Sequence, residues 1–424
     1  MKHKMFPKLT LFMLLSVSCA QEHPFLSGHI RRATDAFLAP CDPYNKGAHH
    51  SCLIFSSASR DSLYAYDATA GELVLAPNGF FPLKIKAGAA VDTLANVLST
   101  NDKFPYFLAL DRAKPSMNVY RLFPAADGSK SFAAPAVYPI DKSPYHLAAL
   151  EQNGEIFLLM TFPDEGLIKV VVLDKDSGKP HDSYQRAISI GTRPSRIAID
   201  YQRTKAVITD EGENNIHTLD VTTIADVVKN GASPLIEAIA LGMTGEQVFL
   251  AHRDFGEGLH VYALIFNAHD KDIRLLNVDT KIWISHTLPE EPMAGYLPDQ
   301  DSSSCCKDSK HWISLVTLKG NLHYLSINQQ SGGLALASAT TVDLTSEDNL
   351  SLSRVHIRKI VGGAILKDKS LKKESICASH RQTFYISSFG SRKSYLNMEP
   401  LEVEAHGYSC EGESSASRFG FKTK

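Results

Sequence analysis

The clearest pattern near the middle of the chain is a set of three short hydrophobic runs. They cover 188–199, 206–210 and 214–220, and within each run apolar and β-branched residues alternate with polar ones. Such alternation is typical of half-buried β-strands, and the polar residues between the runs predict turns. Gly191 and Pro194 interrupt the first run, which predicts a bend there between an outer and an inner strand.

Weaker copies of this unit recur along the chain. Pro144 lies 50 residues before Pro194 in a similar segment. A second marker is an Asp or Asn that ends a predicted strand and opens a turn, and it occurs at Asp67, Asp174, Asp220 and Asn328. Runs at 248–251 with 259–264, and at 383–387 with 394–396, fill the remaining intervals. A period of about 50 residues matches one four-stranded blade. We therefore predict an all-β fold, a β-propeller of seven four-stranded blades over 28–410, with six or eight blades as the alternatives.

The central unit resembles the YVTN family of β-propeller repeats. The pattern of that family runs V-x-V-G-x-x-P-x-x-hydrophobic-A, then hydrophobic-Y-V-x-N, then N-x-V-x-V-I-D, and this chain matches it at Gly191, Pro194 and Asp220. The chain departs from it at Asp210, where the family has Asn, and at 200–204, where the family usually has Pro-Asp-Gly. The resemblance implies the propeller fold without identifying a subfamily.

Alternation within the central unit also predicts where side chains point. We expect Ile197 and Ile199 to lie in an interface between blades, and Val207 to be buried in the next strand. Gly191 is expected to need a backbone conformation that a β-branched residue resists. Arg203, in the hairpin between these strands, is expected to lie at the surface. The recurrent Asp and Asn residues are expected to accept hydrogen bonds in tight turns.

The N-terminus has the pattern of an export signal. Lys2, Lys4 and Lys8 precede an apolar stretch, 9–17, that is much shorter than the roughly 20 residues needed to span a bilayer. We therefore assign 1–18 to a cleaved signal peptide of the lipoprotein type. The remaining boundaries are a linker at 19–27 and a flexible tail at 411–424.

Cys19 is the candidate lipidation site. The segment Leu15-Ser-Val-Ser-Cys19 resembles a bacterial lipobox, although Ser16 stands where that motif usually has Leu. Ala20 after the cysteine resembles the sorting pattern of outer-membrane lipoproteins, so the expected location is the cell envelope, at the outer membrane and facing the periplasm. Ordinary cleavage after Ala20 would instead give a soluble periplasmic or secreted protein.

The other cysteines fit an exported protein, because their even number favours disulfides. They are Cys41, Cys52, Cys305, Cys306, Cys377 and Cys410. Six cysteines allow 15 connectivities, and the sequence does not choose among them. Cys41 with Cys52 is the simplest local pair, and the last two could join the ends of the final unit. Cys305 and Cys306 would then form a vicinal pair or two separate links.

Composition and motifs argue against several function classes. The 44 Lys and Arg residues nearly balance the 46 Asp and Glu residues, and no long basic block occurs, so nucleic acid is not an expected partner. The chain has no H-E-x-x-H, G-x-S-x-G, P-loop or Cys-x-x-Cys motif. We therefore predict no catalytic residues, no metal site and no cofactor. The polar segment 288–310 is expected to be a long loop on one face. The histidines near predicted strand ends, His49, His50, His252 and His260, are expected to be hydrogen-bonded or solvent-facing.

These features together favour binding over catalysis. The expected function is that of an exported, lipid-anchored and monomeric propeller that acts as a binding or scaffolding module in the cell envelope. Its expected partner is an envelope protein or a cell-wall component, recognised through one face. The alternative is a propeller enzyme of the lactonase or dehydrogenase type, with a divalent metal at the mouth of the channel. Convergent His, Asp and Glu side chains at that mouth would favour the enzyme, whereas an apolar or aromatic patch on an otherwise polar face would favour the binder.

Overall fold

The structure is a computed structural model. It describes residues 33–41, 50–57, 62–67, 72–73, 84–86, 91–98, 106–111, 116–121, 133–140, 142–174, 177–255, 258–297, 311–319, 321–330, 333–343, 355–365 and 380–389. The expected signal peptide, linker and tail, together with Cys19, Cys305, Cys306, Cys377 and Cys410, lie outside these residues.

The described elements are antiparallel strands that follow one another in the order of the sequence. The first sheet comprises β1 (Ala33–Cys41), β2 (His50–Ser57), β3 (Ser62–Asp67), β4 (Glu72–Leu73) and β5 (Lys84–Lys86). Two four-stranded groups follow, and a short parallel pairing of β6 with β10 joins them into one sheet. They are β6 (Val91–Leu98), β7 (Tyr106–Asp111), β8 (Ser116–Arg121) and β9 (Ala133–Pro139), then β10 (His146–Gln152), β11 (Glu155–Phe162), β12 (Leu167–Leu173) and β13 (Pro180–Ser189).

The second half of the described chain continues the same arrangement. Its four-stranded sheets are β14 (Pro194–Ile199), β15 (Lys205–Asp210), β16 (Asn215–Asp220) and β17 (Ile236–Ala240); β18 (Gln247–Asp254), β19 (Leu259–Phe266), β20 (Asp272–Asn277) and β21 (Ile282–Thr287); and β22 (Pro292–Tyr296), β23 (His311–Thr317), β24 (Asn321–Gln330) and β25 (Gly333–Asp343). A last sheet pairs β26 (Val355–Ile365) with β27 (His380–Phe389).

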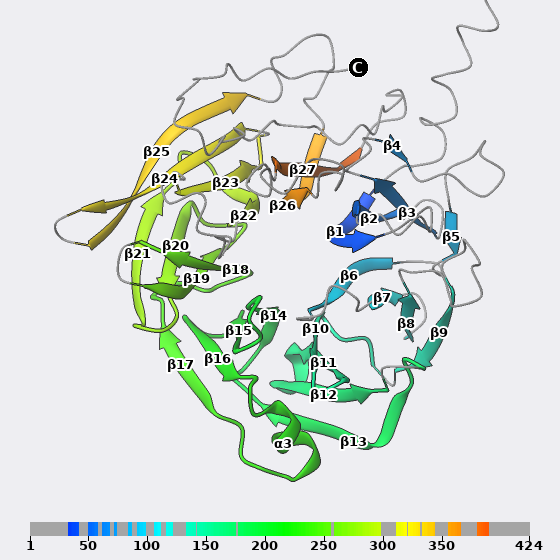
Figure 1. Ribbon diagram of the computed structural model, residues 1–424. Coiled ribbons are helices and arrows are strands. Elements are labelled where there is room, and N and C mark those ends of the chain that lie inside the picture. The colour runs from blue at the N-terminus through cyan, green and yellow to red at the C-terminus, as the bar shows by residue number, and fades with distance from the viewer. Residues whose placement is uncertain are drawn as a thin grey trace, which may run out of the picture.

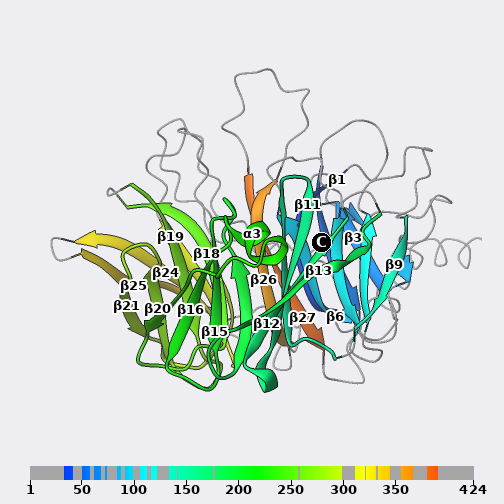
Figure 2. The ribbon, with the colours of Figure 1, turned by 90° about the horizontal axis from the view of Figure 1, so that it is seen from below.

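The sheets stand around a common axis, with the first strand of each group nearest to it (Figure 1, and from the side Figure 2). The inner strands β1, β6, β10 and β14 contact one another in succession, and β14 contacts β18. The ring closes where β22 contacts β26 and β26 contacts β1. The fold is therefore a β-propeller, as predicted. The predicted number of seven blades stays a prediction, because only two strands of the last sheet are described.

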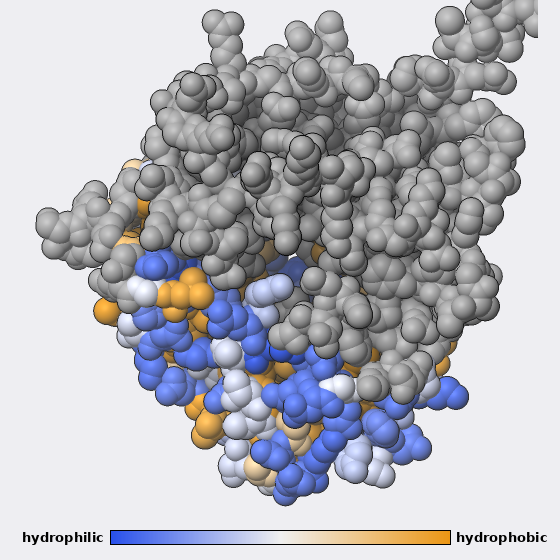
Figure 3. Space-filling model, in the orientation of Figure 1, coloured by the Kyte–Doolittle hydropathy of each residue, from blue (hydrophilic) through white to orange (hydrophobic). Residues whose placement is uncertain are grey.

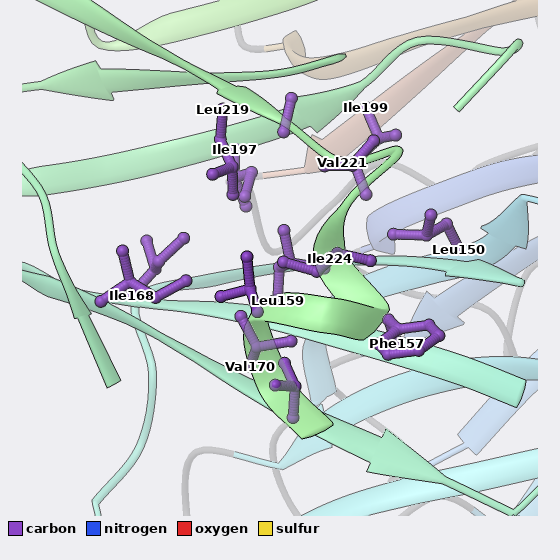
Figure 4. Packing of buried hydrophobic residues seen from close by; sticks show 14 of the residues in the cluster. Leu150, Phe157, Leu159, Ile168, Val170, Ile197, Ile199, Leu219, Val221 and Ile224 are labelled. Carbon is purple, nitrogen blue, oxygen red and sulfur yellow. The ribbon is translucent and has the colours of Figure 1, made fainter. Parts of the chain in front are cut away.

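The core lies between neighbouring sheets. Ile197 and Ile199 of β14 pack against side chains of β10, β11 and β12, including Leu150, Phe157 and Val170 (Figure 4). Val207 belongs to a different cluster, which joins this sheet to β18–β20. Because a twisted sheet carries apolar residues on both faces, each blade is covered by its two neighbours. The predicted burial of these three residues is confirmed.

Gly191 adopts the positive φ predicted for the bend, at 63°. A Cβ at this position would lie 1.9 Å from Asp210 Oδ2 and 2.6 Å from His217 Nε2. Both the conformation and the close approach therefore require glycine.

The predicted turn chemistry is confirmed at Asp174 and Asp220, whereas one marker residue, Asn328, does not end a strand as predicted. Asp174 Oδ1 accepts a hydrogen bond from the Ser177 N–H at 2.7 Å, and Asp220 Oδ1 accepts one from the Thr222 N–H at 2.8 Å. Asn277 does the same at the end of β20, where no marker was predicted. Asn328 is the exception, because it lies inside β24, which continues to Gln330.

Arg203 corrects the surface prediction. It has a positive φ of 59°, its side chain is only 16% exposed, and its guanidinium bonds to both the carboxylate and the carbonyl oxygen of Glu151 in β10. The partner lies in a neighbouring sheet, so the local hairpin pattern gave no sign of it.

The segment expected to be a long loop also needs correction. Residues 292–296 form β22, the inner strand of its sheet, and Leu288 is buried. Flanking Pro and Glu residues disguise this strand. Gly295 suits it, because a Cβ there would lie 2.7 Å from the Phe266 ring.

Among the residues that the structure describes, two short helices interrupt the strands, η1 (Pro163–Glu165) and α3 (Ile224–Lys229). The second was not predicted; it buries Ile224, Val227 and Val228 against the β10–β13 group. Within the described residues, neither helix has the length and apolar character needed to cross a membrane.

Candidate functional site

The two ends of the inner strands define two faces of the ring. We call the face where β14, β18 and β22 begin the top face, and the face where they end the bottom face. The antiparallel pairing places Asp210, the last residue of β15, at the top face, opposite Pro194. It places Asp200, which directly follows β14, at the bottom face.

Asp210 holds the top of its sheet together. It is fully buried, and its carboxylate accepts hydrogen bonds from the N–H groups of Thr192 at 2.7 Å, Arg193 at 3.1 Å and Gly212 at 2.7 Å. The first two donors belong to the segment that connects β13 to β14, and Gly212 belongs to the β15–β16 turn. One carboxylate thus joins two separate backbone segments. It holds them firmly, because hydrogen bonds to a charged acceptor are stronger than those to a neutral one.

His217 and Glu213 lie beside this carboxylate. His217 Nε2 is 3.7 Å from Asp210 Oδ2 and 3.9 Å from Glu213 Oε2. The His217 side chain is only 8% exposed, and its buried Nε2 has no hydrogen-bond partner. Glu213 Oε2 also accepts a hydrogen bond from Asn215 Nδ2 at 3.1 Å. The three side chains offer one nitrogen and two oxygen atoms, all within 4.8 Å of one another, and could hold a metal ion.

The hairpin register explains this convergence. His217 in β16 pairs with Ile208 in β15, and Asp210 lies two residues beyond Ile208. Since side chains two residues apart in a strand share a face, His217 and Asp210 lie diagonally on the same face of the sheet. Glu213 reaches them from the turn between the two strands. The sequence analysis predicted no metal site, and the spacing Asp-x-x-Glu-x-x-x-His across a predicted hairpin is the signal that could have indicated one.

Glu211, next to this cluster, has a different neighbour. Burial is the main cause that raises the pKa of Tyr145, and the charge of Glu211 raises it further. The tyrosine also forms a hydrogen bond with Glu211. The Arg196 guanidinium lies 5.9 Å from the centre of the Tyr145 ring. Glu211 therefore belongs to a separate group of side chains on the top face.

The β22–β25 sheet has an acid at the corresponding corner. Glu290 precedes β22, and its carboxylate accepts hydrogen bonds from Thr317 Oγ1 at 2.7 Å and Asn321 Nδ2 at 3.1 Å. Burial by itself would raise the pKa of Glu290, but these bonds and Lys319, whose Nζ lies at 3.4 Å, outweigh it and lower the pKa.

On the bottom face, Asp200 joins two inner strands. Its carboxylate accepts bonds from the Thr204 and Lys205 N–H groups at 2.7 and 2.5 Å, and His252 Nε2 of β18 lies 3.2 Å away. Burial is the largest single influence and would raise the pKa of Asp200, but the bond from His252 and the two backbone bonds together lower it.

Asp279, also on the bottom face, joins the same two sheets at a second point. Lys205 Nζ donates to its carboxylate at 2.6 Å, and His260 Nδ1 lies 3.4 Å from it. Burial opposes ionisation here as well, but the bonds from Lys205 and the Val261 N–H lower the pKa of Asp279.

Two of the histidines singled out from the sequence, His252 and His260, are thus hydrogen-bonded within the sheets, as expected. His49 and the side chain of His50 lie outside the described residues.

Cys52 is the one candidate cysteine whose side chain the structure describes. It is buried in β2 and takes part in a disulfide. Cys41 ends β1, where its backbone pairs with His50, while Ala39 pairs with Cys52. Which cysteine Cys52 bonds to stays a prediction, as do the other pairings and the lipidation of Cys19.

No protein-family model matches the chain, and no curated protein matches it. Among solved structures, the chain is similar to a functionally unknown protein from Desulfotomaculum acetoxidans, with 10% sequence identity, a TM-score of 0.49, and coverage of 82% of this chain and 96% of that one. It is also similar to a putative 6-phosphogluconolactonase from Bacteroides fragilis, with 12% identity, a TM-score of 0.48 and coverage of 85% and 94%. A third similarity, to the dihydro-heme d1 dehydrogenase NirN, has 11% identity, a TM-score of 0.48 and coverage of 82% and 62%.

Similarities at this level assign no activity. The closed ring of sheets itself defines the class of this protein, which is a β-propeller.

Proposed function

We propose that this chain is an exported, lipid-anchored propeller that serves as a binding or scaffolding module in the cell envelope. Its partner would be an envelope protein or a cell-wall component, held on the bottom face.

The observation that carries this proposal is the composition of the bottom-face connections. Large apolar side chains are exposed at Tyr201 in the β14–β15 turn (62%), Leu259 at the start of β19 (44%) and Ile282 at the start of β21 (68%). The strand directions bring all three to the same face. Apolar side chains exposed among polar ones favour contact with another macromolecule, and aromatic residues are enriched where such contacts are made.

The charged groups of that face support contact rather than chemistry. Asp200 and Asp279 are already occupied by Thr204, Lys205 and the two histidines, so their carboxylates fasten hairpins and sheets. In Figure 3 the described surface turned towards the viewer is mainly hydrophilic, with separate hydrophobic spots. Such a surface offers a few apolar side chains surrounded by polar ones. In many protein interfaces, a few residues of this kind supply most of the binding energy.

A pull-down from detergent-solubilised envelopes tests this proposal. The wild-type protein should retain a specific envelope component, and the double variant Tyr201→Ser, Leu259→Ser should lose it. Leu318→Ser is the matched control, because Leu318 is 54% exposed but directly follows the top end of β23. Equal retention by the wild type and the double variant would exclude the bottom face as the binding surface.

The anchor is tested separately. Cys19→Ser should release the protein from membranes or block its processing, because the acylated thiol would be missing. Unchanged processing and membrane fractionation of this variant would contradict the lipoprotein assignment.

A further inference from the structure

We infer that Asp210, Glu213 and His217 form a binding site for a divalent transition-metal ion at the top face of the β14–β17 sheet. This inference is independent of the proposed partner binding, which concerns the opposite face.

The first observation is the unpartnered nitrogen of His217. Its Nε2 is buried without a hydrogen-bond partner, although it faces two carboxylate oxygens at 3.7 and 3.9 Å. A buried polar atom without a partner loses about 1–3 kcal/mol of solvation free energy, so such atoms usually have a bound ligand or another explanation. A metal ion between the three side chains would use the Nε2 lone pair.

The second observation is the spacing of the donor atoms. In a tetrahedral site with metal–ligand distances of about 2.0–2.2 Å, the ligand atoms lie roughly 3.3–3.6 Å apart. The separations from His217 Nε2 are only slightly larger, and all three donor atoms lie within 4.8 Å of one another. Small shifts of the His217 ring and of the Glu213 side chain, which is 29% exposed, would bring the set to bonding distance. Asp210 and the Gly191 backbone hold the other side of the site fixed.

The donor set favours a transition metal over Ca²⁺ or Mg²⁺. Imidazole nitrogen with carboxylate oxygen is typical of Zn²⁺ and similar ions, whereas Ca²⁺ takes six to eight oxygen ligands. Thr192, Arg193 and Gly212 beside the cluster are exposed, so water can complete the coordination. The ion would join the β15–β16 turn to the strand that follows it, at the corner that Asp210 already fastens to the preceding sheet.

Titration of the full-length mature protein with Zn²⁺ alone, after removal of metal with EDTA, tests this site. We expect Glu213→Gln to raise the dissociation constant for Zn²⁺ by at least about 10-fold and His217→Gln to raise it by about 100-fold. Glu211→Gln is the matched control, since it removes the same charge two residues away but belongs with Tyr145; its affinity should equal that of the wild type. Asp210 is left unchanged because its loss would disturb the fold.

Two further readouts distinguish this site from the cysteines and the other histidines. X-ray absorption of the bound ion should show nitrogen and oxygen ligands with a single imidazole and no sulfur. Zn²⁺ should also raise the thermal unfolding temperature of the wild type and of Glu211→Gln more than that of His217→Gln, because a ligand stabilises the state that binds it. Equal Zn²⁺ affinity in all four proteins, or a sulfur-ligated ion, would overturn the inference. So would tighter binding of Ca²⁺ than of Zn²⁺.

Discussion

In two sheets of the ring, hydrogen bonds to an acidic side chain join the segment before the inner strand to the end of the second strand. The acid belongs to the second strand in one sheet and to the preceding segment in the other. In β14–β17 the acid, Asp210, ends the second strand and accepts N–H groups from the segment that precedes the first strand. In β22–β25 the acid, Glu290, lies in the preceding segment and accepts bonds from Thr317, which ends the second strand, and Asn321, which begins the third. Asp210 and Thr317 occupy the same register position, each opposite a proline that begins the inner strand.

The difference shows that the corner requires a bond between two segments and not a particular residue at one position. The Asp210 carboxylate is fully buried and accepts its bonds from backbone N–H groups, whereas Glu290 accepts them from side chains and stays within reach of Lys319 at the surface. The first arrangement should therefore contribute more to stability than the second. Both corners have a histidine at the same register position: His217 lies beside Asp210, and His323 lies within the electrostatic influence of Glu290.

The largest expected effect concerns the core that surrounds the Asp210 corner. Ile197→Asp should lower the free energy of unfolding by about 4 kcal/mol or more, because it places an unpaired charge between two sheets. Chemical denaturation measures this loss. Gln202→Asp, in the exposed β14–β15 turn, is the control and should change stability by less than about 0.5 kcal/mol. Similar losses in both variants would mean that the assignment of faces to this sheet is wrong.

The comparison between corners is tested next by Asp210→Ala and Thr317→Val. Asp210→Ala removes the buried acceptor of three backbone N–H groups at a corner of the sheet, and should cost about 3 kcal/mol. Thr317→Val removes one hydroxyl and leaves Glu290 bonded to Asn321, so it should cost about 1 kcal/mol. Urea denaturation of both variants measures the difference. An equal cost, or a larger one for Thr317→Val, would refute the proposed inequality of the two corners.

Low pH should destabilise the protein mainly by protonating carboxylates that accept several hydrogen bonds, and Asp200 is the clearest example. Its folded-state pKa is lowered below the unfolded value of about 3.9, so its contribution is fully present above that pH and is lost as the pH falls through the folded pKa. Asp200→Asn should cost about 2 kcal/mol at pH 7, because the amide cannot accept all of these bonds. Thermal melts from pH 7 to pH 2 should show a difference between wild type and variant that is constant above about pH 4 and shrinks as the pH falls further. A constant difference across that range would contradict this role.

The smallest effect is expected at Glu290. Glu290→Gln keeps an oxygen acceptor for Thr317 or Asn321 and removes only the charge, so it should cost about 1 kcal/mol near neutral pH. The same change at Glu237, which is 58% exposed in its pair with Lys281, should have no measurable effect. Denaturation in low and high salt measures both, and a greater loss at Glu237 would mean that burial does not determine the ranking.

The sequence was informative where the structure is local and periodic. Alternation in β14 and β15 predicted the burial of Ile197 and Val207, and the Gly-x-x-Pro spacing located the positive φ of Gly191. In the same way, Asp174 and Asp220 were identified as turn caps, because an Asx turn involves only the next few residues.

Contacts between sheets could not be predicted in this way. The partner of Arg203 is Glu151 and that of Asp200 is His252, each about one repeat away in the sequence. The cluster at His217 depends on the hairpin register together with a segment that arrives from the preceding sheet. β22 was missed because its packing favours the small residue Gly295, which weakens a pattern based on apolar alternation.

The contact of β26 with β1 has a consequence for how the chain reaches its folded state. Nearly the whole sequence separates these two strands, so the ring closes only after almost all of the other strands have formed. Long-range closure of this kind slows folding. During synthesis, one face of the first sheet stays uncovered until the last sheet has formed. That face is the surface most exposed to aggregation or to capture by a chaperone. A circular permutant that opens the chain within another connection and joins the present ends would shift that burden to a different sheet while leaving the finished ring unchanged.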